Sequence, residues 1–188
     1  MRIVGGTLSG RKIEPPLSTV TRPMMDRVRE ALFNILVHRE WGKSVGDLFE
    51  GETHVLDAFC GTGALAFEAI SWGAVRATLF DKDTQALKIA RQNAATLGIT
   101  EQCSIMSGDA LSPPQNSGPK CKLVFLAPPY RKNLIPPTFA AMDGAGWITP
   151  HAVIVAETAK SEKLEILPGC TLNVERSYGD TTLRFFNR

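Results

Sequence analysis

The sequence lacks the groups of cysteine and histidine from which structural metal sites are built. Its four cysteines form no Cys-x-x-Cys pair, and no His/Cys group has the spacing of a zinc site. We interpret these cysteines as free thiols in a reducing compartment. The sequence also has no apolar run long enough to span a membrane and no signal peptide. These absences lead us to expect a soluble, cytoplasmic protein that binds neither a metal ion nor a membrane.

The chain has little net charge, but that charge is unevenly distributed. The formal net charge is +2 over 188 residues, whereas residues 1–39 carry seven basic and three acidic side chains, a net +4. A basic segment on a nearly neutral body is a candidate contact for a polyanion, although a solvated helix face would have the same composition. The length suits one domain, which we expect to comprise an amino-terminal hairpin or arm (1–20), a helical lead-in (21–50) and a core (51–188).

Strand-like and helix-like segments alternate through the core. Apolar, strand-like runs occupy residues 53–59, 77–81, 103–107, 122–127 and 152–157. Helical patterns cover residues 24–38, 63–72, 83–97 and, more weakly, 133–144. This alternation predicts an α/β fold with a parallel sheet and helices on both of its faces. Two strand-like runs around Tyr178-Gly179-Asp180 predict a closing antiparallel hairpin.

A glycine-rich turn follows the first core strand, in Asp57-Ala-Phe-Cys-Gly61-Thr-Gly63. Glycines at this place let a ligand approach the backbone closely, although glycine turns alone are common. Asp57 discriminates between ligands, because a carboxylate repels a pyrophosphate but attracts the ammonium and sulfonium groups of S-adenosylmethionine. The alternative is that Asp57 only satisfies N–H groups of the turn.

Two further acids stand at the ends of the next two predicted strands. Asp81 lies 18 residues after Gly63, where an acid that binds ribose hydroxyls is expected, although it could also serve as a helix-entry residue. Asp109 could accept a hydrogen bond from an adenine amino group. Three acids at three successive strand ends are a more specific signal than any one of them.

The sequence resembles the RsmD family of class I S-adenosylmethionine-dependent methyltransferases. Residues 57–63 are similar to motif I of that class, and Leu126-Ala-Pro-Pro-Tyr130 is similar to the (Asp/Asn)-Pro-Pro-(Tyr/Phe) motif of its nitrogen-methylating members. The stretch from Thr21-Arg-Pro to Asn-Ile-Leu36 is the most family-specific part. The resemblance implies a Rossmann-like fold with a seven-stranded, mostly parallel sheet, an antiparallel last strand and an N-terminal β-hairpin extension. It also implies methylation of guanine N2 in 16S ribosomal RNA during assembly of the small subunit.

The resemblance further implies roles for individual residues. S-adenosylmethionine would be bound by Asp57, Phe59, Gly61, Gly63, Asp81, Lys82, Asp109 and Ala110. The catalytic loop would consist of Ala127, Pro128, Pro129 and Tyr130. Position 127 departs from the family pattern, because Ala127 stands where the family usually has Asp.

The chemistry of methyl transfer determines what such a loop has to do. A guanine amino group is a poor nucleophile, so catalysis depends mainly on its placement. A rigid Pro-Pro turn could aim a backbone carbonyl at the amine, and Tyr130 could stack on the base, although an ordinary strand end could carry the same residues. Losing one transition-state hydrogen-bond partner typically costs about 10²–10³ in rate. Ala127 therefore indicates an altered or impaired loop: a natural variant with a substitute acceptor, an engineered inactive mutant or a retained binding protein.

Several alternatives remain open from the sequence. They are methyl transfer to DNA adenine or to a protein glutamine, a catalytically inactive RNA-binding assembly factor, and a nicotinamide-dependent oxidoreductase. A chain of 188 residues leaves little room for a DNA target-recognition insertion. We expect a monomer whose partner is 16S ribosomal RNA in an assembling small subunit. The candidate phosphate contacts are Arg2, Arg11, Lys12, Arg22 and Arg27.

Overall fold

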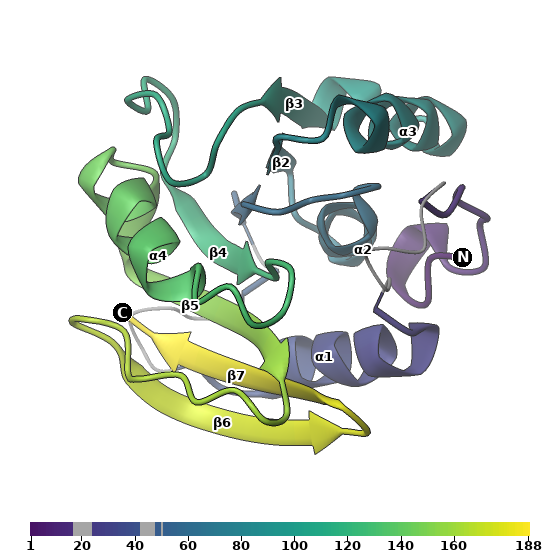
Figure 1. Ribbon diagram of the computed structural model, residues 1–188. Helices are drawn as coiled ribbons and strands as arrows, with labels where there is room; N and C mark the ends of the chain where they lie inside the picture. The colour runs from purple at the N-terminus through teal and green to yellow at the C-terminus, as the bar shows by residue number, and fades with distance from the viewer. Residues whose placement is uncertain (17–23, 42–47, 50) are drawn as a thin grey trace.

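Figure 1 shows the computed structural model of the chain, in which helices cover both faces of a twisted sheet. The structure describes residues 1–16, 24–41, 48–49 and 51–188. Part of the predicted lead-in lies outside the described residues, and so does Arg22, one of the predicted RNA contacts.

The sheet has seven strands in the order β3-β2-β1-β4-β5-β7-β6. The strands are β1 (His54–Asp57), β2 (Arg76–Asp81), β3 (Cys103–Ser107), β4 (Cys121–Leu126), β5 (Ile148–Ala159), β6 (Thr171–Tyr178) and β7 (Thr181–Asn187). Strands β1 to β5 are parallel, whereas β7 runs antiparallel to both of its neighbours, β5 and β6. This arrangement confirms the predicted mostly parallel sheet and its antiparallel last strand.

Helices pack on both faces of the sheet, as predicted. They are α1 (Asp26–His38), α2 (Ala64–Trp72), α3 (Thr84–Leu97) and α4 (Ile135–Gly144), with a short 3-10 helix, η2 (Thr100–Gln102), after α3. Alternate residues of β4 enter two separate cores: Phe125 packs with residues of α1, α2 and α3, and Leu126 with residues of α4. Burial on both faces explains why β4 is continuously apolar. None of the helices in these described ranges is long and apolar enough to cross a membrane.

The predicted N-terminal hairpin is not confirmed. The N-terminal arm, which we define as residues 1–16, contains no β-strand. Its two halves are joined by one antiparallel bridge, between Arg2 and Lys12, and by a 3-10 turn, η1 (Gly6–Leu8). The two halves share a few backbone hydrogen bonds, such as that from Ile3 N–H to the Arg11 oxygen (2.9 Å). The pairing stops there because the following N–H groups, of Val4 and Gly5, donate to Glu68 of α2.

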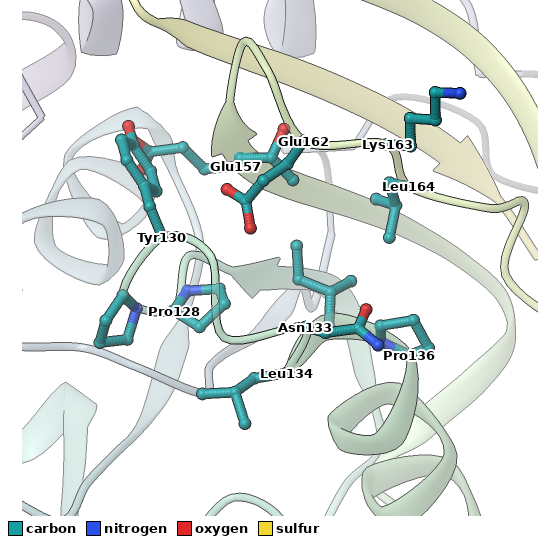
Figure 2. Close-up of a pocket in the computed structure, with 12 residues that line it drawn as sticks. Pro128, Tyr130, Asn133, Leu134, Pro136, Glu157, Glu162, Lys163 and Leu164 are labelled. Carbon is teal, nitrogen blue, oxygen red and sulfur yellow. The ribbon is translucent and has the colours of Figure 1, made fainter.

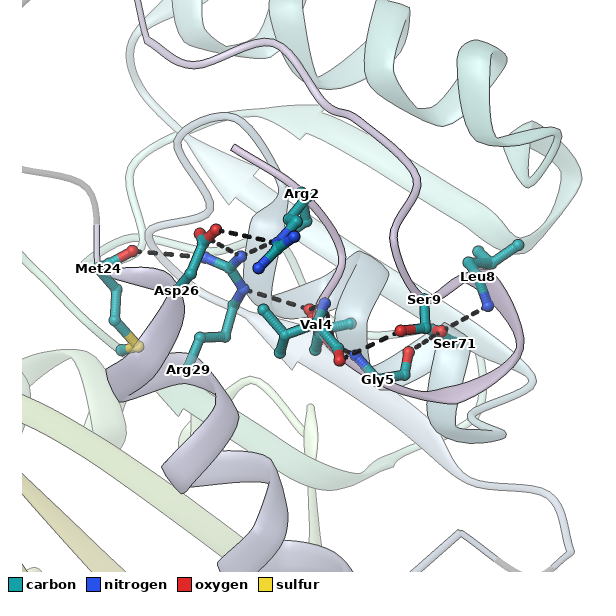
Figure 3. A network of polar contacts seen from close by, with 10 residues as sticks. Arg2, Val4, Gly5, Leu8, Ser9, Met24, Asp26, Arg29 and Ser71 are labelled. Atoms are coloured by element: carbon teal, nitrogen blue, oxygen red, sulfur yellow. Dashed lines mark hydrogen bonds and ion pairs between the residues drawn. The ribbon is translucent and has the colours of Figure 1, made fainter.

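A buried ion pair attaches the N-terminal arm to α1 and α2. Arg29 of α1 is fully buried and donates to Glu68 of α2 (3.2 Å). It also donates to Asp26 (2.9 Å) and to the carbonyl oxygen of Arg2 (Figure 3). Glu68 also accepts the N–H groups of Val4 (3.0 Å) and Gly5 (2.7 Å). Burial raises the pKa of the Glu68 carboxyl, and these donors and Arg29 oppose the rise. The N-terminal arm is therefore fixed by side chains far away in the sequence.

Candidate active site

The candidate site lies where the carboxyl ends of β1, β2 and β4 meet. In the sheet, Asp57 at the end of β1 is paired with Leu79 of β2 on one side and Phe125 of β4 on the other. The chain order along the sheet reverses at β1, because β2 and β3 lie on one side of it and β4 and β5 on the other. In open α/β sheets, ligands bind in the crevice at such a reversal.

Asp57 is a buried carboxyl group without a hydrogen-bond partner among the described residues. It is 1% exposed, and neither Oδ1 nor Oδ2 accepts a hydrogen bond. Burial, and secondarily the charge of Asp81, raise the pKa of Asp57 to about 7. The nearby N–H groups of Phe59 and Ala66 oppose this rise, but neither makes a hydrogen bond of good geometry. The alternative that Asp57 only satisfies the turn is thus not supported, and the orphaned carboxylate suits a cationic ligand group.

The two glycines of the turn have different surroundings. Gly61 and Gly63 both have positive φ, +52° and +87°, which disfavours other residues. A Cβ atom on Gly63 would lie 2.3 Å from the ring of Phe67, whereas a Cβ on Gly61 would meet nothing within 4 Å. Gly63 is therefore required for the packing of α2, and Gly61 borders the open space in which a ligand could approach the backbone. The neighbouring Cys60 is buried, and burial raises the pKa of its thiol, so it is a packing residue rather than a nucleophile.

Asp81 supports the glycine turn from the end of β2. Its Oδ2 accepts the N–H of Gly61 (2.8 Å), and its Oδ1 accepts the N–H of Asp83 (2.9 Å). The side chain that caps α3 is Asp83, so Asp81 does not serve as the helix cap. A carboxylate can accept about four hydrogen bonds, which leaves Asp81 able to accept from a ligand as well.

The remaining predicted cofactor residues differ in how far they are buried. The N–H of Gly108 donates to the backbone oxygen of Asp81 (3.1 Å), which brings the end of β3 to the end of β2. Asp109 follows there, exposed, with its Oδ1 accepting the N–H of Leu111 (2.9 Å). Ala110 is buried, Phe59 is half-buried, and Lys82 is exposed. Within the described ranges, no three His, Cys, Asp or Glu side chains are grouped so that they could hold a metal ion.

The predicted catalytic loop leaves the end of β4 and leads to α4. Ala127 is half-buried, Pro128 is buried, and Pro129 and Tyr130 are exposed. Beyond Tyr130 the backbone becomes strained, because Arg131 and Asn133 have positive φ values of 62° and 49° although neither is glycine. Such strain persists where surrounding contacts hold it, and it is often found at functional sites.

The hydroxyl of Tyr130 is held by two partners. It donates to Oε1 of Glu157 (2.5 Å) and lies 2.8 Å from Oγ1 of Thr181, so the ring has a fixed orientation. Burial and the Glu157 carboxylate raise the pKa of Tyr130 well above its usual range. Tyr130 and Glu157 line, together with Pro128, the small pocket shown in Figure 2. Its volume of about 20 Å³ admits a water molecule and not a base, so a base would have to stack on the exposed ring.

Glu157 is a site residue that is not among those predicted from the sequence. The sequence predicts a strand that ends at residue 157, whereas β5 continues to Ala159, and the burial of the Glu157 side chain raises the pKa of its carboxyl. The signal was available, because an acid at the end of an apolar parallel strand is the same pattern that singled out Asp57 and Asp81.

The predicted RNA contacts fall into two groups. Arg2, Lys12 and Arg27 are exposed; Arg2 makes a long ion pair with Asp26 (3.8 Å). Arg11 is exposed as well, but its guanidinium is hydrogen-bonded within the chain. Its guanidinium donates to the carbonyl oxygens at the end of α3, including that of Leu97 (2.7 Å).

Strand order, glycine turn and orphaned carboxylate together define a class I methyltransferase. A family model described as "Conserved hypothetical protein 95" matches residues 1–187. The chain belongs to that family, the RsmD family of methyltransferases.

Similar proteins agree with this assignment. The chain is 33% identical to "Ribosomal RNA small subunit methyltransferase D" of Escherichia coli, over all of this chain and 90% of the relative, and 33% identical to the protein of that name from Haemophilus influenzae, over 99% and 93%. Among solved structures it is similar to a putative methyltransferase, yhhF, from Escherichia coli, with a TM-score of 0.80 and 31% identity over 100% and 97% of the two chains. An RNA methyltransferase from Salinibacter ruber in complex with S-adenosylhomocysteine shares the fold, with a TM-score of 0.62 at 13% identity over 88% and 92%.

Proposed function

We propose that this protein methylates the exocyclic N2 of a guanine in 16S ribosomal RNA, within an assembling small ribosomal subunit in the cytoplasm. The methyl donor is S-adenosylmethionine. Relatives aligned over the whole chain carry the name of small-subunit ribosomal RNA methyltransferase, which supports an RNA substrate. The Pro-Pro-Tyr loop supports a nitrogen acceptor, because its rigid backbone suits the placement of an amino group.

The observation that carries the proposal is the orphaned carboxylate of Asp57 beside the open side of Gly61. S-adenosylmethionine, when bound, supplies an electrophilic methyl group on a positively charged sulfur. In our proposal Asp57 attracts the cationic methionine part of the cofactor, and the backbone at Gly61 lies against it. Asp81 accepts from the ribose hydroxyls, and Asp109 accepts from the adenine. Phe59, Gly63, Lys82 and Ala110 complete the site.

The chain's own part in the reaction is placement of the base. Tyr130 is fixed through its hydroxyl and presents its ring for stacking, a contact worth about 1–3 kcal/mol per base in other proteins. Pro128 and Pro129 restrict the backbone after Ala127, so that a loop carbonyl can accept a hydrogen of the amino group. That hydrogen bond would turn the nitrogen lone pair toward the methyl group and stabilise the charge that develops on the nitrogen.

The direct test is transfer of tritiated methyl from S-adenosylmethionine to small-subunit particles that lack guanine methylation, with free 16S RNA in parallel. Digestion to nucleosides is expected to give label in N2-methylguanosine, and Tyr130→Ala is expected to lower the transfer rate about 5- to 150-fold by removing the stacking contact. Label in adenosine, in DNA or in protein would identify a different amine as the substrate. Absence of transfer by the native protein, with transfer restored by Ala127→Asp, would identify an inactive RNA-binding factor instead.

A further inference from the structure

Position 127 has a neighbour on the adjacent strand that carries a carboxylate. In the parallel pairing of β4 with β5, Leu126 is opposite Ala156. Ala127 directly follows the last residue of β4, and Glu157 follows Ala156 in β5, so continuing this register by one residue brings Ala127 next to Glu157. Ala127 packs against the core that includes Phe125, which shows that it faces the side of the sheet covered by α1, α2 and α3.

Glu157 also belongs to the same edge of the sheet as the cofactor residues. Asp57 lies two residues after Val55 in β1, and the Val55 side chain enters the same core as Phe125, so Asp57 faces that side of the sheet. The charge of Glu157 also contributes to the raised pKa of Asp57. Glu157 likewise lies two residues after Val155, whose side chain enters this core, so Asp57 and Glu157 face the same side of the sheet. An Asp at position 127 would bring its charge to this same edge, beside Glu157.

The carboxylate of Glu157 is engaged at one oxygen only. Its Oε1 accepts the hydroxyl of Tyr130 at 2.5 Å, and Tyr130 in turn contacts Thr181 of β7 at 2.8 Å. Among the described residues Oε2 of Glu157 has no hydrogen bond. We call the two contacts of the Tyr130 hydroxyl, with Glu157 and with Thr181, the clamp. The clamp joins the catalytic loop to β5 and β7, and it leaves Oε2 of Glu157 able to accept another hydrogen bond.

We propose that Glu157 is the positioning residue of the catalytic loop: it fixes the ring of Tyr130, and it supplies beside position 127 the carboxylate that Ala127 lacks. This inference rests on the proposed methyl transfer, which it deepens. Fixing the ring determines the plane in which a stacked guanine lies, and therefore where its amino group is held. The negative charge of the carboxylate favours the positive charge that develops on the nitrogen during transfer.

Steady-state kinetics on small-subunit particles separates positioning from mere structural support. Glu157→Gln is expected to lower kcat about 10- to 100-fold, while the Kd for S-adenosylhomocysteine and the KM for particles change less than about threefold. Tyr130→Phe keeps the Glu157 carboxylate and the ring but loses the hydroxyl clamp, so it is expected to lower kcat less than Glu157→Gln does. Glu175→Gln removes a carboxylate that pairs with Arg184 on the β6–β7 hairpin, and it serves as the control for loss of one charge.

The decisive comparison is the double variant. If Glu157 replaces the missing acid, Ala127→Asp should recover most of the activity lost in Glu157→Gln. In the native background Ala127→Asp should give no gain, because two carboxylates side by side repel each other. Failure of Ala127→Asp to rescue a folded Glu157→Gln, or a native kcat in Glu157→Gln, would overturn the inference.

A measurement without substrate keeps this result separate from the proposed function. The chain has only two tyrosines, Tyr130 and Tyr178, so ¹³Cζ-tyrosine spectra assign readily with the aid of Tyr178→Phe. At neutral pH the Tyr130 signal is expected to shift in Glu157→Gln and in Thr181→Val, while that of Tyr178 stays in place. An unmoved Tyr130 signal would disprove the clamp whether or not the protein transfers methyl groups, whereas a shifted signal in a protein without transfer would contradict the proposed function alone.

Discussion

Asp57 is the residue whose environment is most unusual for its chemistry. An acid that is buried without a hydrogen bond holds its proton to a higher pH, here up to a pKa of about 7. A bound ammonium would favour the ionised form and lower this pKa. Ligand binding near neutral pH should therefore be coupled to release of a proton.

This coupling predicts a pH-dependent affinity for S-adenosylhomocysteine. Between pH 6 and pH 8 the ionised fraction of a group with a pKa of about 7 rises roughly tenfold, so Kd measured by calorimetry should fall about tenfold. Asp57→Asn should bind more weakly and lose this dependence. Asp109→Asn, which changes an exposed acid, is the control and should keep the pH dependence. A native Kd that is equal at both pH values would contradict a role for the Asp57 carboxylate.

The same raised pKa has the opposite consequence for stability. Because the pKa of Asp57 is higher in the folded chain than its ordinary value of 3.8, the folded state binds more protons between about pH 4 and pH 7. The free energy of unfolding therefore loses a contribution as the pH rises through this window, and the loss is complete above pH 7. At pH 8, urea unfolding should show Asp57→Asn to be more stable than the native chain, by up to about 4 kcal/mol. Below pH 4 the difference should disappear.

At the scale of secondary structure, local rules placed most elements correctly. Helix α3 begins where Asp83 accepts the N–H groups of Gln85 and Ala86, and it ends at Gly98 with φ +73°, as the sequence pattern indicates. The doubly buried strands are continuously apolar and were equally readable. The way the N-terminal arm is held could not be predicted, because its partner Glu68 is more than 60 residues away in the sequence and no local pattern reports such a contact.

Part of the candidate site could also be predicted from the sequence, because the order of the strands determines which residues share an edge of the sheet. Parallel strands bring their carboxyl ends to one edge, so acids such as Asp57 and Asp81 could be grouped without a structure. The support that Asp81 gives to Gly61 and the clamp between Glu157 and Tyr130 were not foreseen, because both depend on side-chain orientation. Arg11 was assigned to RNA although its guanidinium is used at the end of α3.

The glycine turn offers a matched pair of substitutions at this scale. Gly63→Ala should destabilise the protein by about 2–4 kcal/mol, since it combines a positive φ with a contact of 2.3 Å to Phe67. Gly61→Ala meets no atom within 4 Å and should cost only about 1–2 kcal/mol, for its positive φ. Its Kd for S-adenosylhomocysteine should nevertheless rise more than about tenfold, because its methyl group occupies the space next to the ligand. Equal effects of the two substitutions on stability would contradict this distinction.

Over the whole molecule, the basic residues of the amino-terminal segment are divided between binding and folding. Arg2 and Arg27 line a groove of about 480 Å³ together with Asp26 and Glu30, and Lys12 is exposed nearby in the bridge to Arg2. The buried network of Arg29 and Glu68 holds this surface in place relative to α2, whose first turn follows the glycine loop. A phosphate backbone bound there would be held in a fixed relation to the candidate site.

This division predicts that substitutions of the exposed Arg2, Lys12 and Arg27 change the salt dependence of RNA binding, whereas substitution of Arg11 does not. If Arg2, Lys12 and Arg27 contact phosphates, changing each to Ala should reduce the slope of log Kd against log salt concentration by about 0.7–0.9. Arg11→Ala should leave that slope unchanged and instead lower the free energy of unfolding by about 1–3 kcal/mol, because carbonyl groups at the end of α3 lose their donor. Filter binding to 16S RNA at several salt concentrations, with urea unfolding of each variant, measures both quantities. An unchanged slope in a variant that combines Arg2→Ala, Lys12→Ala and Arg27→Ala would place the RNA on another face. A reduced slope in Arg11→Ala would show that this guanidinium leaves α3 to bind RNA.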